Sequence, residues 1–258
     1  MELRPLGKTG LHVSPIGLGT VKLGRDRGLK YAAPAKIPSD EEAVALLRTA
    51  HQIGVNLIDT APAYGTSEER LGKLLYTVAP RQAWEICTKA GEEFNPITAT
   101  SRYDFSPAAI TASVERSLRR LRTDRLDIVL LHFGSSDDAD ARVLAQGEAM
   151  GALRAMQQRG LIRCVGASTG TAEGARLAVE HCDVVMLTFN PGAQQDRPWI
   201  EAAHKRGRGV LIKKPLGSGH AADPAAALRM VLATPGVSSA VVGTSSEANL
   251  RANVAAAE

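Results

Sequence analysis

The chain of 258 residues alternates short apolar runs with longer segments of helical periodicity, and this alternation limits its possible folds. Most of the runs are apolar at consecutive positions, which is typical of parallel strands covered on both faces. Eight strands are predicted, at residues 16–20, 56–60, 84–88, 126–131, 162–167, 184–189, 209–213 and 239–242. Repeated βα units form either a closed (β/α)8 barrel or a doubly wound sheet. No G-x-G-x-x-G follows an early strand, which favours the barrel.

The segments between the predicted strands begin with recognisable helix signals. These are Ser39 with Glu42 and Thr66 with Glu69, which have capping-box spacing, and Ser106 with Pro107 as an N-cap and first helical residue. Residues 3–5 and 12–14 flank LGKTGL and are predicted to form a small hairpin that plugs the bottom of the barrel. No Gly, Ser or Pro stretch is long enough for a linker. We therefore expect residues 1–258 to form a single α/β domain, a TIM barrel with an N-terminal β-hairpin.

Charge and cysteine content exclude some functional classes. Lys and Arg number 31 against 27 Asp and Glu, and the basic residues are scattered. The densest cluster is Arg116, Arg119, Arg120, Arg122 and Arg125. It lies on and after a predicted helix with an apolar opposite face, which indicates a solvated surface and no nucleic-acid partner. Cys87, Cys164 and Cys182 form no CxxC pair and are predicted to be small buried side chains in a reducing compartment.

Targeting and metal signals are also missing from the sequence. The first residues contain no apolar signal-peptide core, and no stretch reaches about 18 uninterrupted apolar residues. We expect a cytoplasmic protein without a membrane partner, as a monomer or a weak homo-oligomer. The six histidines lack HxxxH or comparable spacing, so no metal site is predicted.

Ionisable residues stand where three adjacent predicted strands end. Asp59 closes the second strand with Tyr64 five residues later, Lys89 follows the third, and His132 follows the fourth. Each alone is explained by a structural role, such as a turn residue or a satisfied core histidine. Because barrel strands end at one rim, four ionisable types there are expected to converge on one cavity.

These segments resemble the aldo-keto reductases. The resemblance is carried by LGKTGLHVSPIGLGT, GVNLIDTAPAYGTSEERLGKLL, WEICTKAG and LDIVLLHFG, and it extends from about residue 3 to residue 255. It implies a (β/α)8 fold and hydride transfer between NADPH, or less often NADH, and a carbonyl or alcohol. The tetrad it implies is Asp59, Tyr64, Lys89 and His132.

The chemistry of the four residues agrees with that implication. Carbonyl reduction needs a proton at the oxygen, and Tyr64 is the expected general acid. A cationic Lys89 favours tyrosinate and lowers the tyrosine pKa, while Asp59 keeps Lys89 charged. His132 is expected to hydrogen-bond the substrate oxygen.

The resemblance also assigns the cofactor-binding residues. After strands 7 and 8, a barrel commonly builds a phosphate site from loops and a helix N-terminus. The resemblance implies that residues 213–219 wrap the pyrophosphate and that residues 243–253 hold the adenosine ribose and its 2′-phosphate. The expected residues are Thr20, Asp59, Ser168, Thr169, Lys213, Lys214, Pro215, Leu216, Gly217, Gly243, Thr244, Ser245, Asn249 and Asn253. Ser168-Thr169 and Met186 stand where many relatives use Ser-Asn and Gln to hold the nicotinamide amide. Gly243 and Asn249 replace common Lys and Arg positions, so charge for NADPH would come from Lys213, Lys214 or Arg251.

The substrate pocket is expected to be open and modestly apolar, with broad tolerance of small aldehydes or ketones. Val21, where relatives often have Trp, and Phe133 are the expected lining, with Tyr31 or Phe94 as further candidates. Either the long loops at residues 21–38 and 92–106 or a second subunit is expected to cover it.

Two alternatives remain open at this stage. Lys89 is also suited to be the Schiff-base nucleophile of an aldolase, although pairing with Asp59 would keep its amine protonated. Alternatively, the chain is a catalytically weak NADP(H)-sensing regulatory protein, which the altered amide-binding positions would favour and the intact tetrad opposes.

Overall fold

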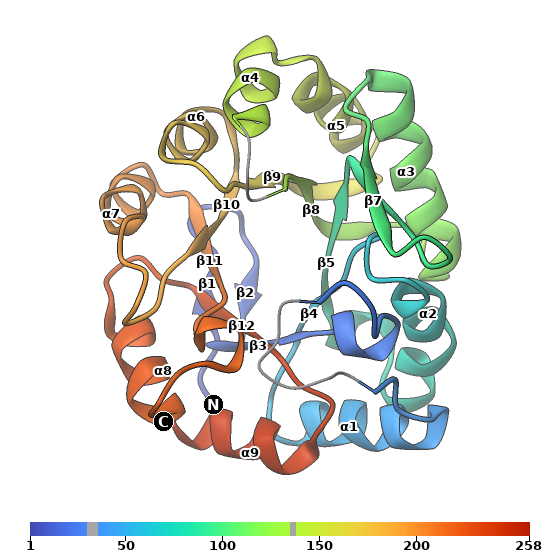
Figure 1. Ribbon diagram of the computed structural model, residues 1–258, viewed down its shortest axis with the longest axis vertical. Helices are drawn as coiled ribbons and strands as arrows, with labels where there is room; N and C mark the ends of the chain where they lie inside the picture. The colour runs from blue at the N-terminus through green and yellow to red at the C-terminus, as the bar shows by residue number, and fades with distance from the viewer. Residues whose placement is uncertain (30–35, 135–137) are drawn as a thin grey trace.

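The computed structural model describes residues 1–29, 36–134 and 138–258. In this part of the chain the eight predicted strands are all present, and parallel pairing closes them into a barrel in the order β10-β11-β12-β3-β4-β5-β8-β9. Figure 1 looks along this barrel and shows the helices as an outer ring around the strands. The predicted (β/α)8 fold is therefore confirmed.

The barrel strands follow chain order, each separated from the next by one or more helices. The strands are β3 Ile16–Gly19, β4 Leu57–Asp59, β5 Glu85–Ala90, β8 Leu126–His132, β9 Ile162–Ser168, β10 Val184–Thr188, β11 Gly209–Lys213 and β12 Ser239–Gly243. The α-helices are α1 Asp40–Gln52, α2 Ser67–Val78, α3 Pro107–Arg120, α4 Ala139–Gln146, α5 Glu148–Gln158, α6 Ala172–His181, α7 Arg197–Lys205, α8 Pro224–Ala233 and α9 Glu247–Ala255. Short 3-10 turns are η1 Val21–Leu23, η2 Arg81–Ala83 and η3 Gly217–Gly219.

Side chains alternate between the barrel interior and the helix-covered outside, as the pleat of a strand requires. One buried cluster fills the interior and includes Leu57, Cys87 and Leu130, while a larger one fills the space between strands and helices. Counting two residues onward from these interior positions leads to Asp59, Lys89 and His132. The same alternation that packs the core therefore carries the ionisable residues to the C-terminal rim.

The predicted N-terminal hairpin is formed by β1 Arg4–Pro5 and β2 His12–Val13, which pair antiparallel. Its apolar residues Leu6, Leu11 and Val13 belong to the interior cluster. The Asn56 amide, just before β4, donates to the His12 carbonyl oxygen at 2.9 Å and ties the hairpin to the barrel. The hairpin thus plugs the end of the barrel opposite the ionisable residues.

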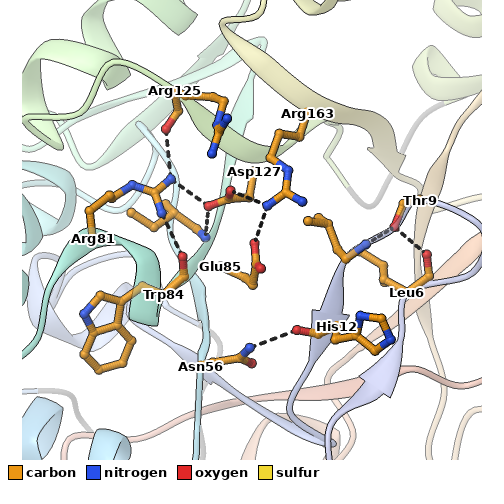
Figure 2. Close-up of polar contacts among 12 residues, drawn as sticks. Leu6, Thr9, His12, Asn56, Arg81, Trp84, Glu85, Arg125, Asp127 and Arg163 are labelled. Carbon is orange, nitrogen blue, oxygen red and sulfur yellow. Dashed lines mark hydrogen bonds and ion pairs between the residues drawn. The ribbon is translucent and has the colours of Figure 1, made fainter.

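A network of charged side chains lies at this same N-terminal end, shown in Figure 2. The Asp127 carboxylate is 2% exposed and accepts hydrogen bonds from Arg81 at 2.7 Å and from the Ile86 backbone N–H at 2.8 Å. Arg163 also reaches it at 3.4 Å and lies 3.5 Å from Glu85. The network links β5, β8 and β9 where these strands begin.

The predicted helix starts are partly confirmed. Ser39 and Glu42 form the complete capping box, and the Ser106 hydroxyl accepts from the Ala109 N–H ahead of α3. The capping box expected at Thr66 is wrong, because its side chain makes no cap hydrogen bond. Thr66 has a turn conformation, and its own N–H donates to the Gly24 carbonyl oxygen at 3.2 Å. Glu69 pairs with an arginine of α3 instead.

The segment 92–106 was expected to be a long loop and is a β-hairpin over most of its length. Strands β6 Glu92–Asn95 and β7 Thr100–Tyr103 pair antiparallel, with Glu92 opposite Tyr103. Both strands are polar and lack the apolar pattern used to predict strands. The hairpin is held in part by hydrogen bonds from Ser101 and Tyr103 to the Glu92 carboxylate.

Other predictions concern buried and surface residues. The three cysteines are buried and free, as expected. In the arginine cluster, Arg116 contacts Glu93, and Arg120 contacts Glu68 and Glu69, so part of the cluster is paired with acidic side chains. Within the described ranges, no helix is both long and apolar enough to span a membrane.

Candidate active site

The structure brings Asp59, Lys89 and His132 together at the C-terminal rim of three neighbouring strands. Asp59 ends β4 and pairs in register with Cys87 of β5, two residues before Lys89. Lys89 pairs with Leu130 of β8, two residues before His132. The parallel pairing of the three strands thus places three residues that are distant in the sequence next to one another.

Lys89 and Asp59 form a buried ion pair. The Lys89 Nζ donates to Asp59 Oδ1 at 2.6 Å and to the Thr60 carbonyl oxygen at 2.8 Å, and the two residues are 1% and 3% exposed. Burial alone would lower the pKa of Lys89, but the Asp59 carboxylate and Tyr64 outweigh it and raise that pKa well above its ordinary value. The amine is therefore held protonated, which disfavours the Schiff-base alternative.

Tyr64 lies on the loop between β4 and α2, with its ring near Lys89 and His132. The Lys89 Nζ is 4.8 Å from the centroid of the Tyr64 ring. The ring centroids of Tyr64 and His132 are 6.1 Å apart in an edge-to-face arrangement. All four tetrad residues therefore meet at one place, as the sequence predicts.

Two glycines allow the Tyr64 loop to approach the η1 turn closely. A side chain at Gly24 would collide with the Ser67 N and the Tyr64 carbonyl oxygen, and one at Gly65 would collide with the Gly24 carbonyl oxygen. The Ser67 hydroxyl then bonds the hydroxyl of Thr20 at 2.9 Å. These contacts fix the loop that carries the phenol.

His132 contacts an acidic residue that sequence reasoning missed. Its Nδ1 lies 2.8 Å from Oε2 of Glu92, at the start of the β6–β7 hairpin. Burial would raise the pKa of Glu92, but His132, Ser101 and Tyr103 outweigh it and lower that pKa to about 2. Burial lowers the pKa of His132, which Glu92 opposes. The one sequence signal that pointed to Glu92 was Gly91, two residues after Lys89. Gly91 has φ +103° and turns the chain at the end of the strand, where Glu92 follows.

Ser168 and Thr169 lie beside His132, because Ser168 pairs with His132 in the register of β8 and β9. The Thr169 hydroxyl is buried and, within the described residues, has no hydrogen-bond partner. An unsatisfied buried hydroxyl is costly, and here it fits a bound group with a matching donor or acceptor. This observation agrees with the predicted role of Thr169 toward the nicotinamide amide.

Lys213 lies at the same place, at the end of β11. Its Nζ donates to the Ser168 hydroxyl at 3.1 Å and to the Thr169 carbonyl oxygen at 2.6 Å. Burial, together with Lys214, lowers the pKa of Lys213 to about 8. Lys213 is therefore directed at the residues expected to bind the amide, and this partly buried second lysine donates to a hydroxyl and a carbonyl oxygen.

A buried carboxylate, Asp140 of α4, holds the loop after Thr169. It accepts from the backbone N–H groups of Gly170 and Thr171 at 2.8 and 2.9 Å, and from the Thr171 hydroxyl at 2.7 Å. These bonds fix the end of β9 and hence the direction of the Thr169 hydroxyl. Sequence reasoning did not identify Asp140.

The loop after β11 was expected to wrap the pyrophosphate through residues Lys213, Lys214, Pro215, Leu216 and Gly217. It forms tight turns in which Lys214, Gly217 and Ser218 all have positive φ. The Gly217 N–H donates to the Lys214 carbonyl oxygen at 2.9 Å. Phosphate binding by this loop stays a prediction, and the Gly217 N–H is already engaged.

The loop after β12 contains Gly243, Thr244 and Ser245 and leads into α9. The Thr244 hydroxyl accepts from the Ser246 N–H at 3.0 Å, and the Ser246 hydroxyl caps α9 through the Asn249 N–H. Ser245 and Asn249 are exposed, whereas Asn253 is buried. Their role toward a dinucleotide stays a prediction.

Arg251 was one of three possible sources of positive charge for a 2′-phosphate. Its guanidinium donates to the Thr49 hydroxyl of α1 at 3.3 Å, and that hydroxyl donates to Glu247. Lys213 is directed at Ser168 and Thr169. Two of the three cations proposed for the 2′-phosphate, Lys213 and Arg251, therefore already contact groups of the protein.

The expected substrate-lining residues are Val21 and Phe133. Val21 begins η1 and is 9% exposed, and Phe133 follows His132 and stacks on Phe105 with centroids 4.7 Å apart. Phe94 lies on β6, with the Arg25 guanidinium 3.6 Å from its ring centroid. Tyr31 and part of the predicted loop 21–38 lie outside the described residues.

A cavity of about 820 Å³ adjoins the predicted cofactor loop. It lies between the loops after β10 and β11 and helix α8, and Lys214 and Gly217 are among its lining residues. The tetrad residues do not line it. This cavity therefore borders the candidate site without containing its reactive groups.

A barrel with a Tyr, Lys, His and Asp cluster at its C-terminal rim defines a class of candidate oxidoreductases, and comparison with known proteins identifies the family. The model of the aldo/keto reductase family matches residues 15–224. The chain belongs to the aldo/keto reductase family.

Several relatives show the breadth of this family. The chain is 31% identical to L-galactose dehydrogenase of Arabidopsis thaliana, over 99% of the chain and 88% of that protein. It is 32% identical to the NADH-specific methylglyoxal reductase of Escherichia coli, over 74% of the chain and 59% of that protein. The second protein is thus matched over less than two thirds of its length.

Solved structures match the fold over nearly the whole chain. A putative aldo-keto reductase from Pseudomonas aeruginosa is 46% identical with a TM-score of 0.87, covering 99% of this chain and 93% of that one. The holo form of an aldo-keto reductase from Bacillus halodurans is 26% identical with a TM-score of 0.84, covering 100% of this chain and 91% of that one.

Proposed function

We propose that this protein is an NAD(P)H-dependent oxidoreductase that reduces an aldehyde or ketone to an alcohol, with Tyr64 as the general acid. The observation that carries the proposal is the meeting of Tyr64, Lys89 and His132 at one rim, with Lys89 buried against Asp59. Supporting it, the unpartnered Thr169 hydroxyl offers a hydrogen-bonding group for a nicotinamide amide.

The bound nicotinamide supplies the hydride, and the residues of the chain manage the oxygen. As the carbonyl carbon gains the hydride, negative charge develops on the oxygen, and the Tyr64 hydroxyl donates its proton there. The Lys89 ammonium, 4.8 Å from the ring centroid, favours the resulting charge on the phenol oxygen. Asp59 keeps the ammonium in place, and His132 binds the substrate oxygen.

NADPH is the proposed cofactor, with NADH as the competing one. Lys214 is the source of positive charge that remains from the sequence prediction, since Lys213 and Arg251 contact other groups. Comparison of the dissociation constants of NADPH and NADH by tryptophan fluorescence tests the preference. A lower constant for NADH would contradict it.

The proposed substrates are small aldehydes or ketones. The relatives suggest two classes to test first, aldoses and the dicarbonyl methylglyoxal, because their named activities involve such compounds. A panel that adds 4-nitrobenzaldehyde, followed by nucleotide absorbance at 340 nm, measures the breadth of the pocket.

The variant Tyr64→Phe tests the mechanism. Removing only the hydroxyl should lower kcat by about 10²- to 10⁴-fold, because the general acid is lost, and should leave the dissociation constant of the dinucleotide within about twofold. Steady-state rates and fluorescence titration measure the two effects.

Three outcomes would contradict the proposal in different ways. Full turnover by Tyr64→Phe would show that Tyr64 is not the general acid. A wild-type protein that binds NADPH but consumes none across the panel would favour the regulatory alternative. Trapping of an aldehyde adduct on Lys89 with borohydride would favour the aldolase.

A further inference from the structure

The contact between Glu92 and His132 sets a chemical constraint on the substrate oxygen. A neutral imidazole carries one N–H, and its other nitrogen is an acceptor. A carboxylate is only an acceptor, so the nitrogen that faces Glu92 must carry the proton to form a hydrogen bond. That nitrogen is Nδ1, which lies 2.8 Å from Oε2.

The surroundings of Glu92 keep it ionised and in place. Its Oε1 accepts from the Ser101 hydroxyl at 2.5 Å and from the Tyr103 hydroxyl at 3.2 Å, both on β7. With Oε1 occupied, Oε2 is directed at His132. Burial raises the pKa of Glu92, but His132, and after it Ser101 and Tyr103, outweigh burial and lower that pKa to about 2. The acceptor is therefore charged throughout the physiological range.

The His132 ring presents its other edge to the site. Nδ1 is buried, whereas the side chain as a whole is 15% exposed, so the exposed part belongs to other atoms. Nδ1 lies 2.8 Å from Oε2 of Glu92, although its N–H is not aligned for a hydrogen bond in this arrangement. Nε2, on the edge away from Glu92, is the nitrogen that remains for a substrate.

We propose that Glu92 is a positioning residue that keeps the proton of neutral His132 on Nδ1. When the ring is neutral, Nε2 then accepts a hydrogen bond from a hydroxyl group. Nε2 donates to a carbonyl oxygen only when both ring nitrogens are protonated. The pair therefore decides whether the site favours the alcohol or the carbonyl. This inference rests on the proposed function for its effect on substrates, but the position of the proton does not depend on turnover.

The charges around His132 determine when the ring is neutral. The charged or titratable groups near the ring and its carboxylate partner are Glu92, Lys89, Lys213, Tyr64, Tyr103 and Arg25. Burial lowers the pKa of His132, Glu92 raises it, and the cations Lys89 and Lys213 lower it further, with a net decrease. The ring is therefore neutral at pH 8, where Nε2 accepts from the hydroxyl of an alcohol. A carbonyl oxygen is then bound by the Tyr64 hydroxyl, and His132 also binds it only at the lower pH where Nε2 carries a proton.

The variant Glu92→Gln reverses this preference while keeping the side-chain shape. The glutamine amide can donate to Nδ1, which allows the proton on Nε2, where it can bind a carbonyl oxygen. At pH 8 we expect the KM for an aldehyde to fall by about five- to tenfold and the KM for its alcohol to rise by a similar factor. A variant that only loosened the hairpin would not move the two constants in opposite directions.

The decisive measurement is a long-range ¹H–¹⁵N correlation spectrum of the whole protein with ¹⁵N-labelled histidine. His132→Gln assigns the signal among the six histidines. We expect neutral His132 to be protonated on Nδ1 in the wild type and on Nε2 in Glu92→Gln. A wild-type Nε2–H tautomer, or the same tautomer in both proteins, would overturn the proposal even if the enzyme is active.

Ser101→Ala is the matched control, since it removes one hydrogen bond to Glu92 and leaves the contact with His132. It should keep the Nδ1–H tautomer and the wild-type ratio of the two KM values. If it changed both as Glu92→Gln does, hairpin packing would be the cause and the proposal would be wrong. If the tautomer changes as predicted but no substrate is turned over, the proposed function fails and the proton assignment stands.

Discussion

At the N-terminal end of the barrel, Asp127 is surrounded by donors from Arg81, Arg163 and a backbone N–H. At the C-terminal end, Lys89 and Asp59 are equally buried, but the nearby Thr169 hydroxyl has no hydrogen-bond partner among the described residues. Both ends thus bury charge against a partner. Among the described residues each end also has a buried polar atom without a hydrogen-bond partner, Trp84 Nε1 at the N-terminal end and the Thr169 hydroxyl at the C-terminal end. At the C-terminal end, however, the rings of Tyr64 and His132 lie directly beside the buried lysine or beside each other. The difference separates charge that holds strands together from charge arranged to meet a ligand.

Removing the lysine of the C-terminal pair should have the largest effect. Lys89→Met leaves the Asp59 carboxylate buried and unpaired, which should reduce the free energy of unfolding by about 3–5 kcal/mol. It also removes the cation beside Tyr64, so kcat should fall by about 10³-fold. Urea unfolding and steady-state kinetics measure the two effects.

Lys213→Met sharpens this prediction. Lys213 is at the same rim, but it donates hydrogen bonds to the neutral oxygens of Ser168 and Thr169. Its replacement breaks no hydrogen bond to a carboxylate and removes only the longer-range attraction to Asp196, so the stability loss should be well below that of Lys89→Met. Equal losses would mean that the Lys89–Asp59 charge pair has no special importance for stability.

The variant Asp127→Asn tests the other end. The two arginines lose their common carboxylate, and we expect the free energy of unfolding to fall by about 3 kcal/mol. Well below the melting temperature, kcat and KM should stay within about twofold, because the network is at the far end of the barrel from Tyr64. A large loss of kcat in a folded protein would contradict the separation of the two ends.

The sequence predicted the fold and the tetrad better than it predicted the contacts between side chains around the tetrad, for physical reasons. The barrel, its hairpin plug and the tetrad follow from local patterns, because apolar runs define strands and parallel strands end at one rim. The role of Glu92 depends on a polar hairpin pairing with itself and then reaching His132, forty residues further along the chain. The contacts of Lys213 likewise depend on which neighbour its side chain reaches across β10. Such contacts have no local signature in a single sequence.

The smallest expected effect concerns Glu85, at the edge of the N-terminal network. Burial and the neighbouring Asp127 raise the pKa of Glu85 to about 7 from an ordinary value of 4.5, although Arg163 opposes them. Because the folded protein holds this proton more tightly than the unfolded chain, the stabilisation is complete below about pH 4.5 and is lost as the pH rises through 7. Glu85→Gln remains neutral and should avoid that loss.

Between pH 5 and 8 the free energy of unfolding of the wild type should therefore fall relative to that of Glu85→Gln, by less than about 1 kcal/mol after solvent screening of the partly exposed side chain. Urea titrations of both proteins at each pH unit measure the difference. Parallel pH curves would mean that Arg163 fully compensates the charge on Glu85. The N-terminal network would then be insensitive to pH, and a response of the protein near pH 8 would originate at the C-terminal rim, where burial lowers the pKa of Lys213 to about 8.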